Sequence, residues 1–241
     1  MFTRLLVGLD GSPQADIALE QAVILGERFR STLMVVHVRE RRDSDADLLT
    51  RAAERVTAAG LAMETLPDTG EPSEVLVRLA AGADLVCIGR QGRKRTAALG
   101  PTARTVIKRA GKCTLVCGGS PSPMRRVAVA YDGGPTSQRA LDLGLRYSAV
   151  AGSELDVIHA GDPAAGATVV AQAEMALSMN PVVYRTHVRA GEPGVVVAAV
   201  IRESRCDALF VGAHVEAGRD PDVSHAEAIL VETDIPVMIQ P

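Results

Sequence analysis

Three glycines lie close together between Ile88 and Arg109, in the stretch IGRQGRKRTAALGPTARTVIKR. They are separated by two and then by seven residues: Gly89, Gly92 and Gly100. Glycine lets backbone N–H groups approach an anion closely. A helical pattern follows from about Pro101 or Thr102, and its first turn would present free N–H groups and the positive end of the helix dipole. The stretch therefore predicts a phosphate-binding loop, with an ordinary connecting turn as the alternative.

The same stretch is strongly basic. Eight basic residues and no acidic residue lie between Gly89 and Lys112. They are Arg90, Arg93, Lys94, Arg95, Arg104, Lys108, Arg109 and Lys112. Basic residues beside a glycine loop favour an anionic ligand or an acidic partner surface over a merely solvated face.

The composition limits the class of protein. Hydrophobic residues make up 47% of the 241 residues, but aromatic residues only 2%, so the core must consist of Val, Leu, Ile and Ala. Such a core suits buried parallel strands covered by helices. The net charge of −3 does not favour nucleic-acid binding. We find neither a signal peptide nor a membrane span in the sequence, and we expect a cytoplasmic protein.

Apolar, strand-like runs alternate with helical patterns through the first half. The expected strands are Arg4–Leu9, Thr32–Val38, Leu61–Leu66, Asp84–Ile88 and Cys113–Cys117. The expected helices begin near Ser12, Asp45, Pro72 and Pro101. This β-α alternation predicts a doubly wound, five-stranded parallel sheet with helices on both faces and right-handed crossovers.

After a linker from Gly118 to Pro123, the pattern repeats. The first strand and the Asp-Gly that follows it recur at an offset of 122, with Asp132 in the place of Asp10. Three further blocks recur in the same order within one residue of this offset: VVHV as VIHA, GEP as GEP, and DLVCIG as DALFVG. The chain is therefore a duplication with domains at about 1–119 and 124–241.

These repeated blocks give each half a resemblance to the universal stress protein family. The resemblance implies an adenine nucleotide alpha-hydrolase-like fold with strand order 3-2-1-4-5, and a pseudo-dimer of the two halves through their last strands. It is compatible with a further homodimer. It also implies binding of ATP, with Mg, in the first half. The residues carried over are Asp10, Val38, Ile88, Gly89, Gly92 and Gly100, with Thr102 as a further hydroxyl donor.

The phosphate motif departs from the family pattern G-x2-G-x9-G-[S/T]. The second spacer has seven residues, and Pro101, which has no N–H, stands where Ser or Thr is expected. In the second half only Gly212 remains, since Val215 and Val223 occupy the other two glycine positions. The region from Gly212 to Ile235 carries six acidic residues and one basic residue. We therefore expect at most one nucleotide per chain, bound in the first half.

Other candidates for chemistry favour structural roles. We expect Cys87, Cys113, Cys117 and Cys206 to be inert thiols and His37 and His159 to be structural. His214 and His225 have no metal-ligand partners at suitable spacing, and no nucleophile elbow or Walker lysine motif is present. The leading hypothesis is a regulatory or protective stress protein with at most slow ATP hydrolysis. The alternatives are a scaffold that binds protein partners through the basic loop, and, less favoured, an enzyme acting on a nucleotide.

Overall fold

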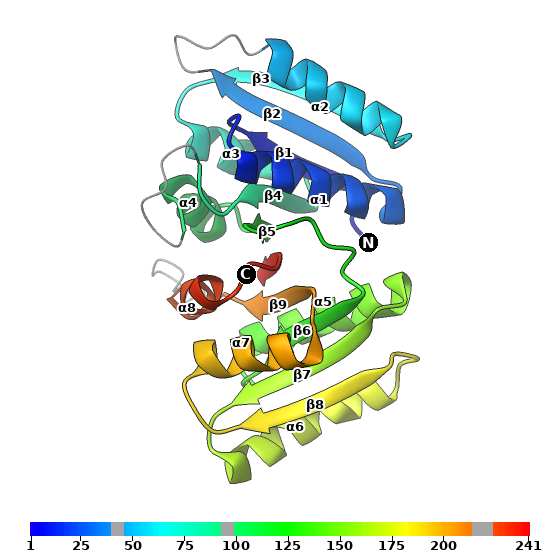
Figure 1. The fold of residues 1–241 in the computed structure, drawn as a ribbon, viewed down its shortest axis with the longest axis vertical. Coiled ribbons are helices and arrows are strands. Elements are labelled where there is room, and N and C mark those ends of the chain that lie inside the picture. Colours follow the sequence, from blue (N-terminus) through cyan, green and yellow to red (C-terminus); the bar gives the residue numbers. More distant parts are fainter. Residues whose placement is uncertain (40–45, 93–98, 214–223) are drawn as a thin grey trace. The chain divides into compact units, whose positions relative to one another are not determined.

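The computed structural model describes residues 1–39, 46–92, 99–213 and 224–241 (Figure 1). The chain forms two compact units, Met1–Pro121 and Ser122–Pro241. The boundary between them lies inside the Gly-, Ser- and Pro-rich linker that the sequence indicates. In the part of the chain that the structure describes, no helix is both long and apolar enough to cross a membrane.

In the part that the structure describes, the first unit has five parallel strands and four helices. Its strands are β1 (Arg4–Leu9), β2 (Thr32–Arg39), β3 (Ala62–Thr69), β4 (Leu85–Gly89) and β5 (Cys113–Cys117). Its helices are α1 (Pro13–Phe29), α2 (Ala46–Ala58), α3 (Pro72–Ala80) and α4 (Pro101–Arg109). The strand pairings run β3-β2-β1-β4-β5, and every pair is parallel. The predicted fold class and strand order are confirmed.

Local sequence signals explain where the first elements begin and end. The hydroxyl of Ser12 accepts the N–H of Ala15 at 3.2 Å, and Pro13 starts α1. Strand β3 runs three residues beyond its predicted end, Leu66, and includes Pro67. In the described sheet β3 pairs only with β2, so it is an edge strand. Proline has no backbone N–H, and an edge strand tolerates it because one side of the strand has no neighbour that needs a hydrogen bond.

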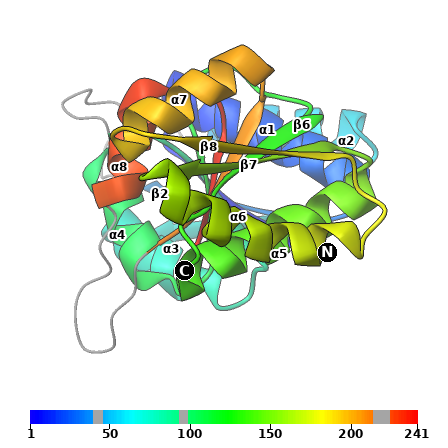
Figure 2. The same ribbon diagram turned by 90° about the horizontal axis from the view of Figure 1, so that it is seen from below.

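The second unit repeats this architecture. Its strands are β6 (Arg126–Ala130), β7 (Glu154–Ala160), β8 (Tyr184–Arg189), β9 (Ala208–Gly212) and β10 (Val237–Gln240). Its helices are α5 (Pro135–Ala151), α6 (Pro163–Ser178), α7 (Pro193–Ser204) and α8 (Ser224–Glu232). The strand order is β8-β7-β6-β9-β10. In Figure 2, α5 and α6 lie on one face of this sheet, and α7 and α8 lie on the other.

The topology determines where a ligand site can form. In the first unit the chain leaves β1 toward β2 and β3 on one side, and it later adds β4 and β5 on the other side of β1. In such a sheet, ligands bind beyond the carboxyl ends of the strands where the strand order reverses. That position lies beyond β1 and β4, which end in Leu9 and Gly89.

Candidate functional site

A cavity of about 390 Å³ opens beyond the carboxyl ends of β1, β2 and β4 in the first unit. Its walls come from these strand ends, from the loop after β4 and from the first turns of α1, α3 and α4. All residues carried over from the family resemblance line it. These are Asp10, Val38, Ile88, Gly89, Gly92, Gly100 and Thr102. The fold thus brings together five segments that are far apart in the sequence.

Asp10 directly follows β1 and is held by its own turn. Its Oδ1 accepts the N–H of Ser12 at 2.9 Å, and Gly11 between them has a φ of 74°, which favours glycine. Gly92 approaches from the loop after β4, and a Cβ added at Gly92 would lie 2.7 Å from Oδ2 of Asp10. The carboxylate and the glycine loop are therefore in direct contact.

Gly89, at the end of β4, packs against the first turn of α1. A Cβ added at Gly89 would lie 2.9 Å from the backbone carbon of Gln14 and 3.0 Å from the nitrogen of Ala15. A side chain at this position would therefore point at the helix backbone and not at a ligand in the cavity. The close approach of strand and helix by itself explains why glycine is needed here.

The start of α4 forms the opposite wall. Gly100 is the N-cap residue and has no side chain to cap the helix, and Pro101 occupies the first helical position. The N–H of Arg104 donates to the carbonyl of Gly100 at 3.0 Å, while Thr102 and Ala103 line the cavity within the first turn. The first turn therefore directs the positive end of the helix dipole at the cavity, although Pro101 contributes no N–H.

The ends of β2 and β4 give the cavity an apolar and well-packed surface. Val38 is 9% exposed and Ile88 is 4% exposed, and Leu76 of α3 lies beside them. The Nδ1 of His37 bonds to the carbonyl oxygen of Leu9 at 2.7 Å. His159 makes the equivalent bond to the carbonyl oxygen of Tyr131 at 2.9 Å, so both histidines hold the backbone at the end of the first strand of their unit, in keeping with the structural role that the sequence predicts.

Glu71 places an acidic group at the same cavity. It is the N-cap of α3, and its Oε2 accepts the N–H of Glu74 at 3.0 Å and the hydroxyl of Ser73. The hydrogen bond from Ser73 lowers the pKa of Glu71 below its ordinary value, so the carboxylate stays ionised at neutral pH. Sequence reasoning treated this residue only as part of a helix start.

The basic residues between Gly89 and Lys112 have different surroundings in the structure. Arg90 lines the cavity, and its guanidinium lies over Gly118, where an added Cβ would come within 3.0 Å of Nε. Arg109 pairs with Glu74 of α3 through both guanidinium nitrogens. Arg104, Lys108 and Lys112 are not among the described residues that line the cavity. Arg93, Lys94 and Arg95 lie outside the described residues.

Sequence reasoning missed Gln14. This side chain is 8% exposed in the first turn of α1, and its Oε1 accepts the backbone N–H of Gln91 at 2.5 Å. Only the expected strand order could have indicated that Gln14 contributes to the site. The first turn after β1 and the loop after β4 must lie side by side at the switch point, so a polar residue there can bridge them.

The corresponding region of the second unit is built differently. The Oδ1 of Asp132 accepts the N–H of Gly134 at 2.7 Å and the hydroxyl of Ser137 at 2.5 Å. Helix α6 lies close by, since a Cβ added at Gly133 would lie 3.2 Å from Val169. Gly212 packs on α5 just as Gly89 packs on α1, with 2.4 Å between an added Cβ and the backbone carbon of Thr136. The predicted residues His214, Val215 and Val223 lie outside the described residues.

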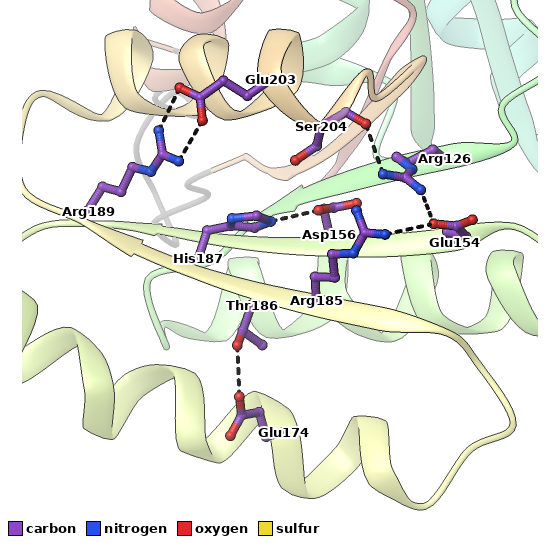
Figure 3. Close-up of polar contacts among 10 residues, drawn as sticks. All are labelled: Arg126, Glu154, Asp156, Glu174, Arg185, Thr186, His187, Arg189, Glu203 and Ser204. Carbon is purple, nitrogen blue, oxygen red and sulfur yellow. Dashed lines mark hydrogen bonds and ion pairs between the residues drawn. The ribbon is translucent and has the colours of Figure 1, made fainter.

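A cluster of charged residues connects β6, β7, β8 and α7 in the second unit (Figure 3). Asp156 is 1% exposed, and it accepts a hydrogen bond from Nε2 of His187 at 2.6 Å. The carbonyl of Ser204 accepts a hydrogen bond from Arg126 at 3.0 Å. In the described part of the chain, the imidazole of His187 bonds to Asp156 and not to a serine hydroxyl, so this cluster lacks the nucleophile–base contact of a hydrolase triad.

The cysteines behave as core residues. All four are buried and free, and burial raises the pKa of each thiol, that of Cys206 to about 12. Such thiols are poor nucleophiles at neutral pH, which confirms the sequence prediction. Across the described ranges, no group of three or more His, Cys, Asp or Glu side chains is placed to hold a metal ion.

The comparisons with known proteins agree with this fold. The model of the universal stress protein family matches residues 1–117 and again residues 123–241. A universal stress protein from Archaeoglobus fulgidus has a TM-score of 0.84 at 19% identity, over 98% of this chain and 97% of its own. A protein of unknown function from Pseudomonas aeruginosa PAO1 has a TM-score of 0.74 at 15% identity, over 99% of this chain and 92% of its own.

A universal stress protein in complex with cAMP is 27% identical over 48% of this chain and 97% of its own, with a TM-score of 0.44. No curated protein sequence gives a significant match. Because the family model covers nearly all of both halves, the chain belongs to the universal stress protein family and carries two of its domains in tandem.

Proposed function

We propose that the first domain binds ATP or a related adenine nucleotide and that the protein acts in a stress response as a regulatory or protective nucleotide-binding protein. The observation that carries the proposal is the convergence of Asp10, Val38, Ile88, Gly89, Gly92, Gly100 and Thr102 on one cavity. The cavity lies at the switch point of a doubly wound sheet, where such folds bind ligands.

The two sides of the cavity suit different parts of a nucleotide. The apolar surface of Val38 and Ile88 suits a base, and the carboxylate of Asp10 suits a ribose hydroxyl or a base donor. The first turn of α4, with the hydroxyl of Thr102, suits the phosphates. Mg would enter with the phosphates of ATP and would neutralise part of their charge.

The differences between the domains support one site per chain. In the second domain Asp132 already accepts two hydrogen bonds from its own turn, and Val169 of α6 lies against Gly133. The sequence from Gly212 to Ile235 carries six acidic residues and one basic residue, which disfavours a phosphate chain. We therefore assign the nucleotide to the first domain.

We further propose that the protein does not turn the nucleotide over at an enzymatic rate. In the described part of the cavity wall, His37 bonds to a backbone carbonyl, and Glu71 caps α3 with its side chain. The hydroxyl that donates to Glu71 belongs to Ser73, which is buried and is not among the described residues that line the cavity, so this pair does not present a nucleophile and base to a ligand. We expect hydrolysis far slower than the roughly 10 per second of a median enzyme. Rapid phosphate release that an Asp10 variant abolishes would contradict this.

Titration calorimetry of the full chain with ATP tests the binding proposal. The matched variants are Asp10→Asn and Asp132→Asn, which keep an acceptor oxygen for the turn but remove the charge. Asp10→Asn should weaken binding roughly tenfold, because a hydrogen bond to a charged group is lost. Asp132→Asn should leave affinity and a stoichiometry of one unchanged. Affinity should also fall as salt rises.

Two outcomes would overturn the assignment. Weaker binding only in Asp132→Asn would place the site in the second domain. Absence of binding in the wild type would favour the alternative function, a scaffold that contacts protein partners through its basic surface. Pro101 and the shortened spacer would then be the physical cause.

A further inference from the structure

The side chain of Gln14 joins two parts of the first domain that are distant in sequence. It extends from the first turn of α1, and its Oε1 accepts the backbone N–H of Gln91 at 2.5 Å across 77 positions. The side chain is 8% exposed, and it is not among the described residues that line the cavity. Its contact is with Gln91 of the loop that follows β4, a residue that does line the cavity.

The loop residues that Gln14 contacts are also held on other sides. The N–H of Arg90 donates to the carbonyl of Cys117 at 2.7 Å, and the N–H of Gly100 donates to the carbonyl of Arg90 at 2.8 Å. A Cβ added at Gly100 would lie 3.4 Å from the Cα of Gln91. The backbone of Arg90 and Gln91 thus lies between α1, the end of β5 and the start of α4.

This arrangement gives the Gln14 amide a specific task. The contacts with Cys117 and Gly100 connect the loop to β5 and α4, whereas the hydrogen bond from Gln91 connects it to α1. Gly92 follows directly and contacts Asp10. The hydrogen bond thereby helps set the position of both the loop and the first turn of α4 before a ligand arrives. A site arranged in advance binds more tightly because less ordering is needed on binding.

We infer that Gln14 is a positioning residue for the anionic part of the ligand, acting through the loop backbone at Gln91 and Gly92. The inference rests on the proposed function, since it assumes that a nucleotide occupies this cavity. It also assigns different requirements to two parts of the site. The phosphate-binding side depends on Gln14, whereas the apolar side at Val38 and Ile88 does not.

The test compares ATP with adenosine, which lacks the phosphates. In Gln14→Met the side chain keeps its length and loses the acceptor oxygen. We expect affinity for ATP to fall roughly tenfold, as for the loss of one hydrogen bond in a preorganised site. Affinity for adenosine should stay unchanged, and hydrogen exchange without ligand should become faster at Gln91. Gln14→Thr, which introduces the residue type found at the equivalent position Thr136, should behave in the same way.

Gln138→Met is the matched control. Gln138 lies in the first turns of α5, where it accepts the hydroxyl of Tyr131 at 2.9 Å and donates to Asp142 at 3.0 Å, so the same substitution removes side-chain hydrogen bonds in the other domain. It should leave the affinities for ATP and adenosine unchanged. An unfolding curve of each variant shows whether the domain is intact.

The outcomes separate this inference from the proposed function. If the wild type binds ATP and both Gln14 variants bind it equally well, the positioning role is wrong and the proposed function stands. If the variants lose ATP and adenosine equally and unfold earlier, Gln14 only stabilises the domain and the inference is again wrong. If the wild type binds neither compound, the proposed function is wrong, and the positioning role, which depends on it, is wrong as well.

Discussion

The backbone at Gly92 lies so close to Asp10 that a Cβ at residue 92 would come within 2.7 Å of Oδ2. The two residues are 82 positions apart, and they meet because β1 and β4 are neighbours in the sheet. The carboxylate that follows the first strand and the loop that follows the fourth therefore form one surface. A change in one of them must alter the position of the other.

Gly92→Ala should weaken ATP binding without unfolding the domain. The added methyl group would displace the Asp10 carboxylate, which is the end of a side chain and can move. We expect affinity to fall by roughly the tenfold that a lost hydrogen bond costs, with little change in the unfolding midpoint. Gly82→Ala is the control, because its Cβ would meet only ordinary contacts at 3.7 Å. Unchanged ATP affinity in Gly92→Ala would argue against a role for this contact.

Substitutions at Gly89 and Gly212 should instead reduce stability. An added Cβ would lie 2.9 Å from backbone atoms of α1 in one case and 2.4 Å from those of α5 in the other. Helix backbone cannot move aside cheaply, so we expect each Ala variant to lower the free energy of unfolding of its own domain by roughly 1–3 kcal/mol. Urea unfolding curves, again with Gly82→Ala as control, measure this effect. Wild-type stability in both variants would show that strand and helix separate more easily than their packing indicates.

The second domain should lose stability in acid through Asp156. Burial raises the pKa of this carboxyl, but the hydrogen bond from His187 and the charges of His187 and Arg126 outweigh burial and hold the pKa below its ordinary value. The pKa is thus lower in the folded than in the unfolded state. Its contribution to stability is present above the unfolded pKa of about 4 and is lost as the pH falls through the folded value.

Asp156→Asn tests this contribution. The variant should be less stable by roughly 2 kcal/mol at neutral pH, because a hydrogen bond to a charged group is lost. It should also show a flatter decline in stability below about pH 4. Urea unfolding at a series of pH values compares the two proteins. The same acid dependence in variant and wild type would assign the effect to other carboxylates.

The four thiols should be unreactive in the folded protein. Burial raises the pKa of all four, and that of Cys206 is about 12, so few thiolates form at neutral pH. We expect a thiol reagent such as Ellman's reagent to label none of them in native buffer and all four in denaturant. Rapid labelling of one thiol in native buffer would reveal local opening around that residue.

Much of the fold follows from the sequence by itself. Alternating strand and helix patterns, Ser12 and Pro13 at a helix start, and the recurrence of Asp10 as Asp132 are local or periodic signals. They indicate two five-stranded parallel sheets, and the resemblance to the universal stress protein family implies the strand order that brings the site residues to one edge. These local and periodic signals do not show where a side chain points, because its direction depends on which elements pack together.

Only the tertiary structure decided what individual residues contact. Gly89 looks like a ligand-binding glycine in the sequence and Gly212 like the remnant of one, but a helix backbone lies against each of them and leaves no room for a side chain. Arg109 counts as part of a basic cluster in the sequence, yet its charge is paired with Glu74 of a neighbouring helix. The link from Gln14 to Gln91 spans 77 positions and exists only because α1 packs against the loop after β4. Spacing along a chain shows which elements form, whereas the distances between them come from packing.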